Sequence, residues 1–171
     1  DYCAAAKNRT RQSVPRLLIL GILAGMFIAL AGTAASVGGA LAGKIASAAI
    51  FPAGLAMVIL AGSELFTGNC LFLLPLLRGD ITGGRTMGSW AIVYCGNLIG
   101  SIVIAFVVVR CGVLDSIAPA AIATAAAKAS LPFGAAFLRG VLCNLLVCLA
   151  VWMAFCAGSA GGKVISLYGP I

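Results

Sequence analysis

A single acidic residue, Glu64, stands in the middle of a long apolar stretch, within the segment GSELFTGN at residues 62–69. A carboxylate at the centre of a bilayer costs several kcal/mol unless donors surround it. Two glycines in the segment favour a break in the helix, and a break frees backbone N–H groups at the start of the second half. The pattern predicts a broken helix whose loop, held by Glu64, lines a pore. A buried polar cluster that joins helices is the alternative. The polar and small neighbours of Glu64 are Gly62, Ser63, Thr67, Gly68 and Asn69.

Three more polar residues accompany a later apolar run at 131–157. Arg139 is expected to extend its side chain to the membrane interface. Asn144 lies five residues further along and therefore deeper, where its amide offers a donor and an acceptor to a partner or a permeating ion. Lys128 precedes the run in an Ala-rich segment, and the residues alone favour an ordinary solvated charge.

The sequence offers little to an enzyme or a metal site. It has no His, no phosphate-binding loop and no nucleophile beside a base. Its cysteines form no C-x-x-C motif, so we expect small apolar residues buried between helices rather than ligands or disulfides. The expectation is no catalytic activity, no metal and no cofactor. The cysteines are Cys3, Cys70, Cys95, Cys111, Cys143, Cys148 and Cys156.

Composition places the chain in a membrane. Hydrophobic residues make up 63% of its 171 residues, charged residues 9%, and the mean hydropathy is +1.17. Soluble domains carry about a quarter charged residues, and roughly 20 apolar residues suffice for a helical crossing. The first apolar run is too long for a signal peptide and more spans follow it. The net charge of +7 comes from residues near span ends, which favours membrane topology over nucleic-acid binding.

Hydropathy predicts four membrane spans and the start of a fifth. The spans are 17–41, 46–77, 87–109 and 131–157, and a fifth run begins at Val164. A short helix is expected near Pro119 and a tight turn at 158–163. We therefore expect one transmembrane channel domain over residues 1–171, truncated within the fifth span. Basic residues before the first span predict a cytoplasmic N-terminus, with Lys44 and Lys128 on the opposite side.

An internal repeat is visible in two of these spans. Residues 21–31 align with residues 140–150, and three spans separate the copies. This spacing inverts the second copy in the membrane, as in many transporters and channels with broken helices. Chance similarity between apolar segments is the alternative. In the first copy, Gly21 and Gly25 form a G-x-x-x-G pair, which favours close helix packing.

Three motifs resemble those of the formate/nitrite transporter family. GSELFTGN at 62–69 is similar to one family signature, NLLVCLAVW at 144–152 to a second, and YCGNLIG at 94–100 also matches. Their order and spacing agree from residue 16 to residue 171. The resemblance implies an all-α integral membrane protein, an aquaporin-like six-helix bundle with an inverted repeat and broken helices. It also implies a homopentamer in which each protomer has its own pore.

The resemblance further implies roles for individual residues. Phe51 matches an aromatic constriction on the cytoplasmic side, and Thr67 would direct its hydroxyl into a central chamber. The family's central histidine, second constriction and sixth helix would lie beyond Ile171. The implied pathway residues are Phe51, Leu65, Phe66, Thr67, Asn144, Val147 and Lys128, and the residues that support the pore loop are Gly62, Glu64, Gly68 and Asn69.

The function implied is a channel in the inner or plasma membrane for small monovalent anions. Formate is the first expectation, with nitrite or hydrosulfide as alternatives within the family and with proton coupling, acetate and lactate left open. Lys128 near the outer mouth would concentrate anions, because a narrow apolar gate imposes a large desolvation cost on them. A non-conducting membrane scaffold that reuses the fold is the alternative from another class.

Overall fold

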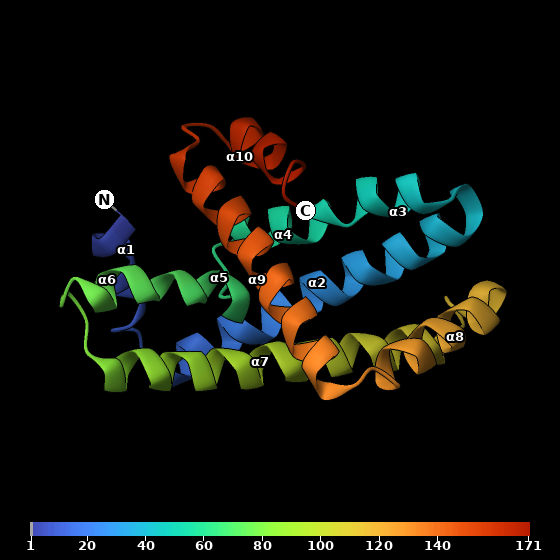
Figure 1. Cartoon of the computed structure of the whole chain (residues 1–171), viewed down its shortest axis with the longest axis horizontal. Coiled ribbons are helices and arrows are strands. Elements are labelled where there is room, and N and C mark those ends of the chain that lie inside the picture. The colour runs from blue at the N-terminus through green and yellow to red at the C-terminus, as the bar shows by residue number, and fades with distance from the viewer. Residues whose placement is uncertain (1) are drawn as a thin grey trace.

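The computed structural model describes residues 2–171, so Asp1 of the polar N-terminal segment lies outside the described residues. Every regular element of this part of the chain is helical, as the sequence predicts. Figure 1 shows their arrangement. In order they are α1 (Tyr2–Arg9), α2 (Val14–Ala42), α3 (Lys44–Ile50), α4 (Pro52–Leu60), α5 (Phe66–Asn69), η1 (Cys70–Phe72), α6 (Leu73–Leu77), α7 (Gly83–Arg110), η2 (Asp115–Ile117), α8 (Ala118–Ala129), α9 (Phe133–Cys156) and α10 (Ala160–Leu167).

Three helices, α2, α7 and α9, are long and apolar enough to cross a membrane. They confirm the predicted first, third and fourth spans. The predicted second span forms two shorter apolar stretches, Lys44–Leu60 and Phe66–Leu77, separated by a non-helical segment. The broken helix is therefore confirmed, and the short helix near Pro119 is confirmed as α8.

Helices α2 and α7 run side by side and in the same direction (Figure 1). Glycines of the two helices face each other: a Cβ on Gly96 would lie 2.9 Å from the carbonyl oxygen of Leu18 and 3.0 Å from the Cα of Gly21. Gly25 and Gly100 are tighter still, because a Cβ on either would overlap a backbone carbonyl of the other helix. The glycines therefore allow backbone contact that no larger residue permits.

The break in the second span follows from its local chemistry. Gly62 adopts a φ of 67°, a left-handed conformation that favours glycine, and turns the chain out of α4. The amide of Ser63 then donates to the carbonyl of Val58 at 3.0 Å, which closes the end of α4. Leu65 is extended, with φ −107° and ψ 128°, and α5 begins at the next residue.

The predicted turn at 158–163 is wrong in its extent, because α10 begins at Ala160. Ser159 caps this helix, and its hydroxyl oxygen accepts a hydrogen bond from the amide of Gly162 at 3.1 Å. This N-cap allows Gly161, Gly162 and Lys163 to be helical despite the low helix propensity of glycine. Lys163 therefore lies in the first turn of α10 and not in a loop.

Helix α9 crosses the α2–α7 pair steeply and returns toward the end of the molecule at which α2 begins (Figure 1). The two copies of the sequence repeat, in α2 and α9, therefore lie on helices that cross at a steep angle (Figure 1). Most of α9 is exposed within the described chain, and this exposure bears on the predicted burial of the cysteines. Four of them are exposed rather than buried, since they lie on faces of α7 and α9, or in the turn after α7, that no described helix covers: Cys95, Cys111, Cys143 and Cys156.

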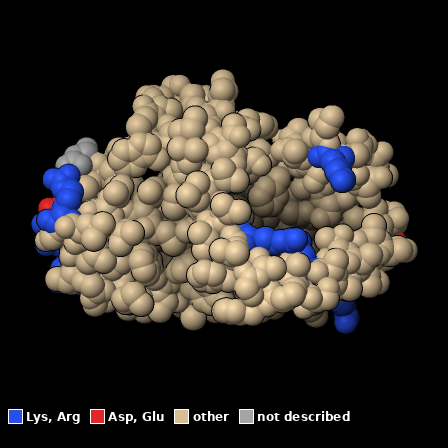
Figure 2. Space-filling model, viewed as in Figure 1, with Lys and Arg blue, Asp and Glu red and all other residues tan. Residues whose placement is uncertain are grey.

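Charged residues are few on the face that Figure 2 shows, as expected of a surface in contact with lipid. Basic residues cover the left end, where α1, α6 and the start of α7 lie, and a few more surround a hollow in the right half. This distribution agrees with helices that cross a membrane along the long axis of the molecule.

Candidate functional site

The broken segment of the second span is held in place by one amide side chain, Asn97 of α7. Its Oδ1 accepts a hydrogen bond from the amide of Phe66 at 2.9 Å. Its Nδ2 donates to the carbonyl of Glu64 at 2.9 Å and to the carbonyl of Gly21 in α2 at 2.8 Å. Asn97 thus pairs backbone groups that the break in the helix exposes, in a region where water is scarce.

Glu64 lies in this segment and is 2% exposed. Its amide donates to the carbonyl of Leu20 in α2 at 3.2 Å, so the loop is joined to α2 directly here and indirectly through Asn97, which donates to Gly21. Its carboxylate is paired with Arg9 of α1, whose Nε lies 3.6 Å from Oε1. From the sequence, we expected free N–H groups of the second half-helix to stabilise Glu64. The structure instead supplies a guanidinium from a distant part of the chain, which neutralises the buried charge.

Aromatic residues of α7 support the second half-helix. The ring of Phe66 packs in a T-shaped geometry against Tyr94 and Trp90, with centroid distances of 5.4 and 6.4 Å, respectively. The indole Nε1 of Trp90 donates to the carbonyl of Asn69 at 2.9 Å. Asn69 itself is 2% exposed, and Gly68 is buried where a Cβ would lie 3.3 Å from Val151 of α9. These contacts fix α5 between α7 and α9.

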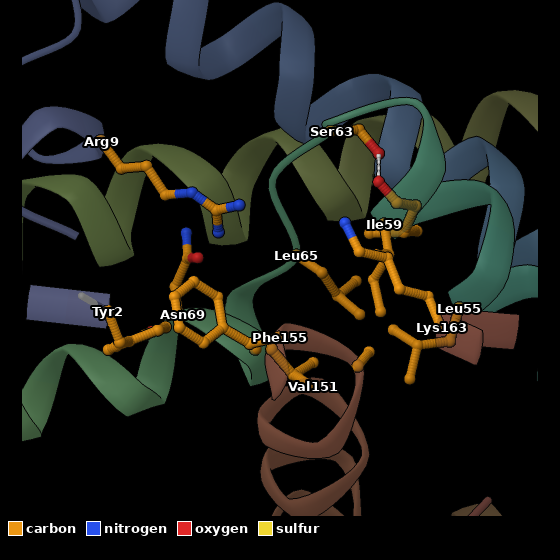
Figure 3. Close-up of a pocket in the computed structure, with 13 residues that line it drawn as sticks. Tyr2, Arg9, Leu55, Ile59, Ser63, Leu65, Asn69, Val151, Phe155 and Lys163 are labelled. Atoms are coloured by element: carbon orange, nitrogen blue, oxygen red, sulfur yellow. Dashed lines mark hydrogen bonds between the residues drawn. The ribbon is translucent and has the colours of Figure 1, made fainter. Parts of the chain in front are cut away.

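A cavity of about 130 Å³ lies beside the broken segment (Figure 3). Its wall is mostly apolar, but several polar side chains project toward it, among them the basic residues Arg9 and Lys163. A mostly apolar cavity with a few polar groups is the usual form of a small-molecule site. The lining residues are Tyr2, Arg9, Leu55, Val58, Ile59, Ser63, Leu65, Gly68, Asn69, Val151, Ala154, Phe155 and Lys163.

Helix α1 closes one side of this cavity. Tyr2 packs against Phe155 and Trp152 of α9, with ring centroids 5.3 and 5.7 Å apart. Tyr2 is only 7% exposed, and burial raises the pKa of its phenol to about 12, although Arg9 nearby acts in the opposite direction. The neutral phenol is therefore the form that docks α1 against α9.

The structure brings some of the predicted pathway residues together and leaves others apart. Leu65, Gly68 and Asn69 line the cavity, and Glu64 is paired with one of its basic residues. Phe51 does not line it: the residue lies between α3 and α4 and is 39% exposed. Leu55, one helical turn after Phe51, occupies the cavity wall instead and is 3% exposed.

The remaining predicted residues lie along α9 and in the loop itself. Val147 packs against the apolar core that includes Ala150 and Ala154. Thr67 is partly buried, and its carbonyl accepts a hydrogen bond from the thiol of Cys148 at 3.4 Å. Asn144 is partly buried, and its Oδ1 has no hydrogen-bond partner among the described residues. An unpaired amide oxygen on a membrane helix calls for a partner, from another chain segment, water or solute.

Lys128 lies far from this cavity, in an exposed position of α8. It lines a second, more open hollow of about 560 Å³ between α8 and the end of α2, and Lys44 lines the same hollow. The hydroxyls of Ser36, Ser47 and Thr124 are its other polar groups. Both lysines therefore belong to one end of the molecule, as the predicted topology requires.

Sequence reasoning missed four residues that carry the site: Asn97, Arg9, Leu55 and Val151. Asn97 lies within the motif at 94–100, so the motif was noticed but its amide was not assigned a role. Leu55 could have been found from the i, i+4 spacing that puts it on the same helical face as Phe51. The pairing of Arg9 with Glu64 has no local signal, because 54 residues separate the two.

The fold and the site agree with the comparison to known families. The formate/nitrite transporter family matches residues 1–171, which is the whole chain. The chain belongs to the formate/nitrite transporter family. It is therefore a membrane protein of a family of transporters and channels, and the resemblance of its sequence motifs is confirmed.

Several curated members of the family are similar along the chain. The formate channel FocA of Haemophilus influenzae is 35% identical over 185 residues, which cover 100% of this chain and 64% of the relative. The uncharacterized transporter YrhG of Bacillus subtilis is 36% identical over 179 residues, 98% of this chain and 67% of the relative. The chain thus spans about two thirds of the length of these curated relatives.

Solved structures of the family share the fold. A pentameric formate channel with formate bound superposes with a TM-score of 0.78 at 31% sequence identity, over 92% of this chain and 66% of that one. An FNT family ion channel gives a TM-score of 0.77 at 29% identity, over 98% of this chain and 71% of that one. This chain therefore shares the fold of these channels over about two thirds of their length.

Proposed function

We propose that this chain forms most of a channel protomer that conducts small monovalent anions across a cell membrane, with formate as the preferred ion. One observation carries the proposal: in a chain of this family, a broken span and α9 enclose a mostly apolar cavity that basic side chains enter. Relatives named as formate channels and a pentameric formate channel with formate bound support formate and a homopentamer. Nitrite and hydrosulfide are the alternatives, and a nitrite transporter of Salmonella typhimurium is 42% identical over 114 residues.

The walls of the cavity support passage of a small ion rather than of a larger solute. Leu65, Leu55 and Val151 narrow it, and the Glu64–Arg9 pair keeps the buried carboxylate from repelling an anion. Phe51, Phe66, Thr67, Asn144, Val147 and Lys128 complete the proposed pathway. Gly62, Glu64, Gly68 and Asn69 shape its loop. We propose transport without catalysis and without a cofactor.

The proposed topology places the N-terminus and the loop at 78–85 in the cytoplasm, and Lys44 and Lys128 outside. It also treats residues 1–171 as one channel domain. Labelling of single cysteines in intact cells, in a variant without native cysteines, tests the topology. A cysteine at position 128 that reacts with an impermeant reagent only from the inside would overturn it.

Transport by the complete protein in liposomes tests the function. Initial uptake of formate, nitrite, hydrosulfide, acetate and lactate would be compared with uptake by liposomes without protein. The proposal expects formate uptake well above the lipid background and above that of lactate. Uptake equal to the background for all five anions would contradict it, and would favour a scaffold that keeps the fold without conducting.

A further inference from the structure

Lys163 is a cavity residue to which neither the sequence motifs nor the ion pair assign a role. It lies in the first turn of α10, is partly buried, and lines the same cavity as Arg9 and Leu65. In Figure 3 its side chain extends from α10 toward Leu65, while Arg9 approaches from the opposite side. Two basic residues, one from each end of the described chain, therefore line the same cavity.

Only one of these two basic residues has its charge neutralised by an acidic partner. Arg9 is paired with Glu64, so together the two contribute little net charge to the cavity. Lys163 forms no ion pair within residues 2–171. Of the other described carboxylates, Asp80 pairs with Arg78 and Asp115 begins η2, and neither lines the cavity. The cavity therefore carries about one uncompensated positive charge, that of Lys163.

The position of Lys163 is not explained by the stability of its helix. A cation in the first turn faces the positive end of the helix dipole, which is unfavourable by a few tenths of a kcal/mol or more. A solvated lysine at a membrane interface would be the ordinary alternative, as for the exposed Arg85 at the start of α7. Arg85 however lines no part of this cavity, whereas Lys163 shares it with apolar walls and the polar groups of Ser63 and Asn69.

We propose that Lys163 makes this cavity a binding site for a small monovalent anion, which it holds beside Leu65. The inference rests on the proposed anion transport and names the residue that attracts the ion within the cavity. The ammonium supplies charge and up to three donors, and the side-chain amide of Asn69, whose Nδ2 has no partner among the described residues, offers a further donor to a carboxylate. Charge rather than fork geometry matters for such a diffusing ion, so an arginine at this position serves as well.

The test uses the complete protein in liposomes, with the initial uptake of formate measured over a range of formate concentrations at low salt. Lys163→Gln is expected to raise the half-saturating concentration roughly three- to tenfold, the effect of one unit charge a few ångströms away. The maximal uptake at saturating formate is expected to change little, because the narrow part of the pathway is intact. Lys163→Arg should stay near the parent, and Arg85→Gln serves as the matched loss of a charge outside the cavity.

The controls separate this inference from the proposed function. A parent that takes up no formate contradicts the function itself, whereas the variants matter only once the parent conducts. Lys163→Met, which keeps the stem without the charge, must show the same shift as Lys163→Gln, and the elution profile of each variant in detergent reports its folding. A half-saturating concentration equal to that of the parent in either folded neutral variant would overturn the proposal. So would a shift of the same size in Arg85→Gln.

Discussion

The two halves of this molecule differ in how completely the described chain buries them. Helix α2 buries six residues and α7 buries seven, mostly small ones, and the two helices meet at backbone distance. Helix α9 buries only Ala150 and Ala154, and α8 buries none. The first half is tightly packed, whereas most of the second half is exposed within the described chain.

This difference in burial separates the residues that support the broken segment from two residues that we propose to contact the ion. The residues that hold the broken segment, Asn97 and the facing glycines, belong to the tightly packed half. Lys128 and Asn144, which we propose to meet the ion, belong to the sparsely buried half. Changes at the contacts between α2, α7 and the broken segment should therefore affect the free energy of unfolding, whereas changes at Lys128 and Asn144 should affect transport first.

The largest effect is expected at Gly25. In Gly25→Ala the new Cβ overlaps the backbone carbonyl of Asn97, so the two helices must separate. Overpacking of this kind costs about 3 kcal/mol, and backbone movement here also disturbs the broken segment. Gly140→Ala in α9 is the control, because a Cβ there meets no atom within 4 Å. Thermal unfolding in detergent measures the stability of both variants. Equal melting temperatures for the two would contradict the difference in packing between the two halves of the molecule.

Asn97→Ala should come second. It leaves the amide of Phe66 and the carbonyls of Gly21 and Glu64 without their partner, which costs about 2–3 kcal/mol in a poorly hydrated site. Asn144→Ala removes an amide with an unpaired oxygen and should cost less than about 0.5 kcal/mol. Denaturant titrations of both variants decide it. A loss of stability in Asn144→Ala as large as that in Asn97→Ala would remove the distinction between the two halves.

A smaller effect is expected for Lys128, which lies in the open hollow. Lys128→Gln should lower formate uptake about two- to threefold at low salt, and salt should abolish the defect, because the Debye length is about 10 Å at 0.1 M. Lys128→Arg should retain the parental rate, since only the charge matters. Arg110→Gln, which removes an exposed charge that lines no cavity, is the control. A Lys128→Gln variant as fast as the parent at low salt would return Lys128 to the solvated surface.

The smallest effect concerns Tyr2 and the docking of α1. Because burial raises the pKa of its phenol to about 12 from an ordinary value of 10, the docked state is favoured fully below pH 10 and loses this advantage as the pH rises toward 12. The difference between the tyrosinate absorbance of the parent and of Tyr2→Phe isolates this titration. A difference curve with a midpoint near pH 10 would show that Tyr2 is not buried against α9.

Local chemistry explains which parts of the fold could be predicted. The long apolar runs sufficed for α2, α7 and α9, and the two glycines around Glu64 sufficed for the break. The motif at 62–69 also led to Leu65 and Asn69, which line the cavity. All of these predicted features depend on residues that are close together in the sequence and that together determine the local conformation.

The parts that could not be predicted depend on how distant segments meet. Arg9 reaches Glu64 only because α1 docks on α9 through Tyr2, and nothing near either residue indicates this contact. Asn97 acquires its partners only once the glycines set the register of α2 against α7. The exposure of Phe51 depends on where α3 ends, so its place in the pathway stays a prediction.

If anions pass through the cavity beside Leu65, then Leu65→Trp in the complete protein should block their transport. Tryptophan adds several heavy atoms to a cavity of about 130 Å³, while the scaffold of α2, α7 and Asn97 is untouched. Initial formate uptake into liposomes is measured beside the elution profile of the purified variant. We expect uptake near that of liposomes without protein, from a variant that elutes like the parent. Uptake at the parental rate by a correctly assembled Leu65→Trp variant would show that the anion takes a path other than the cavity beside Leu65.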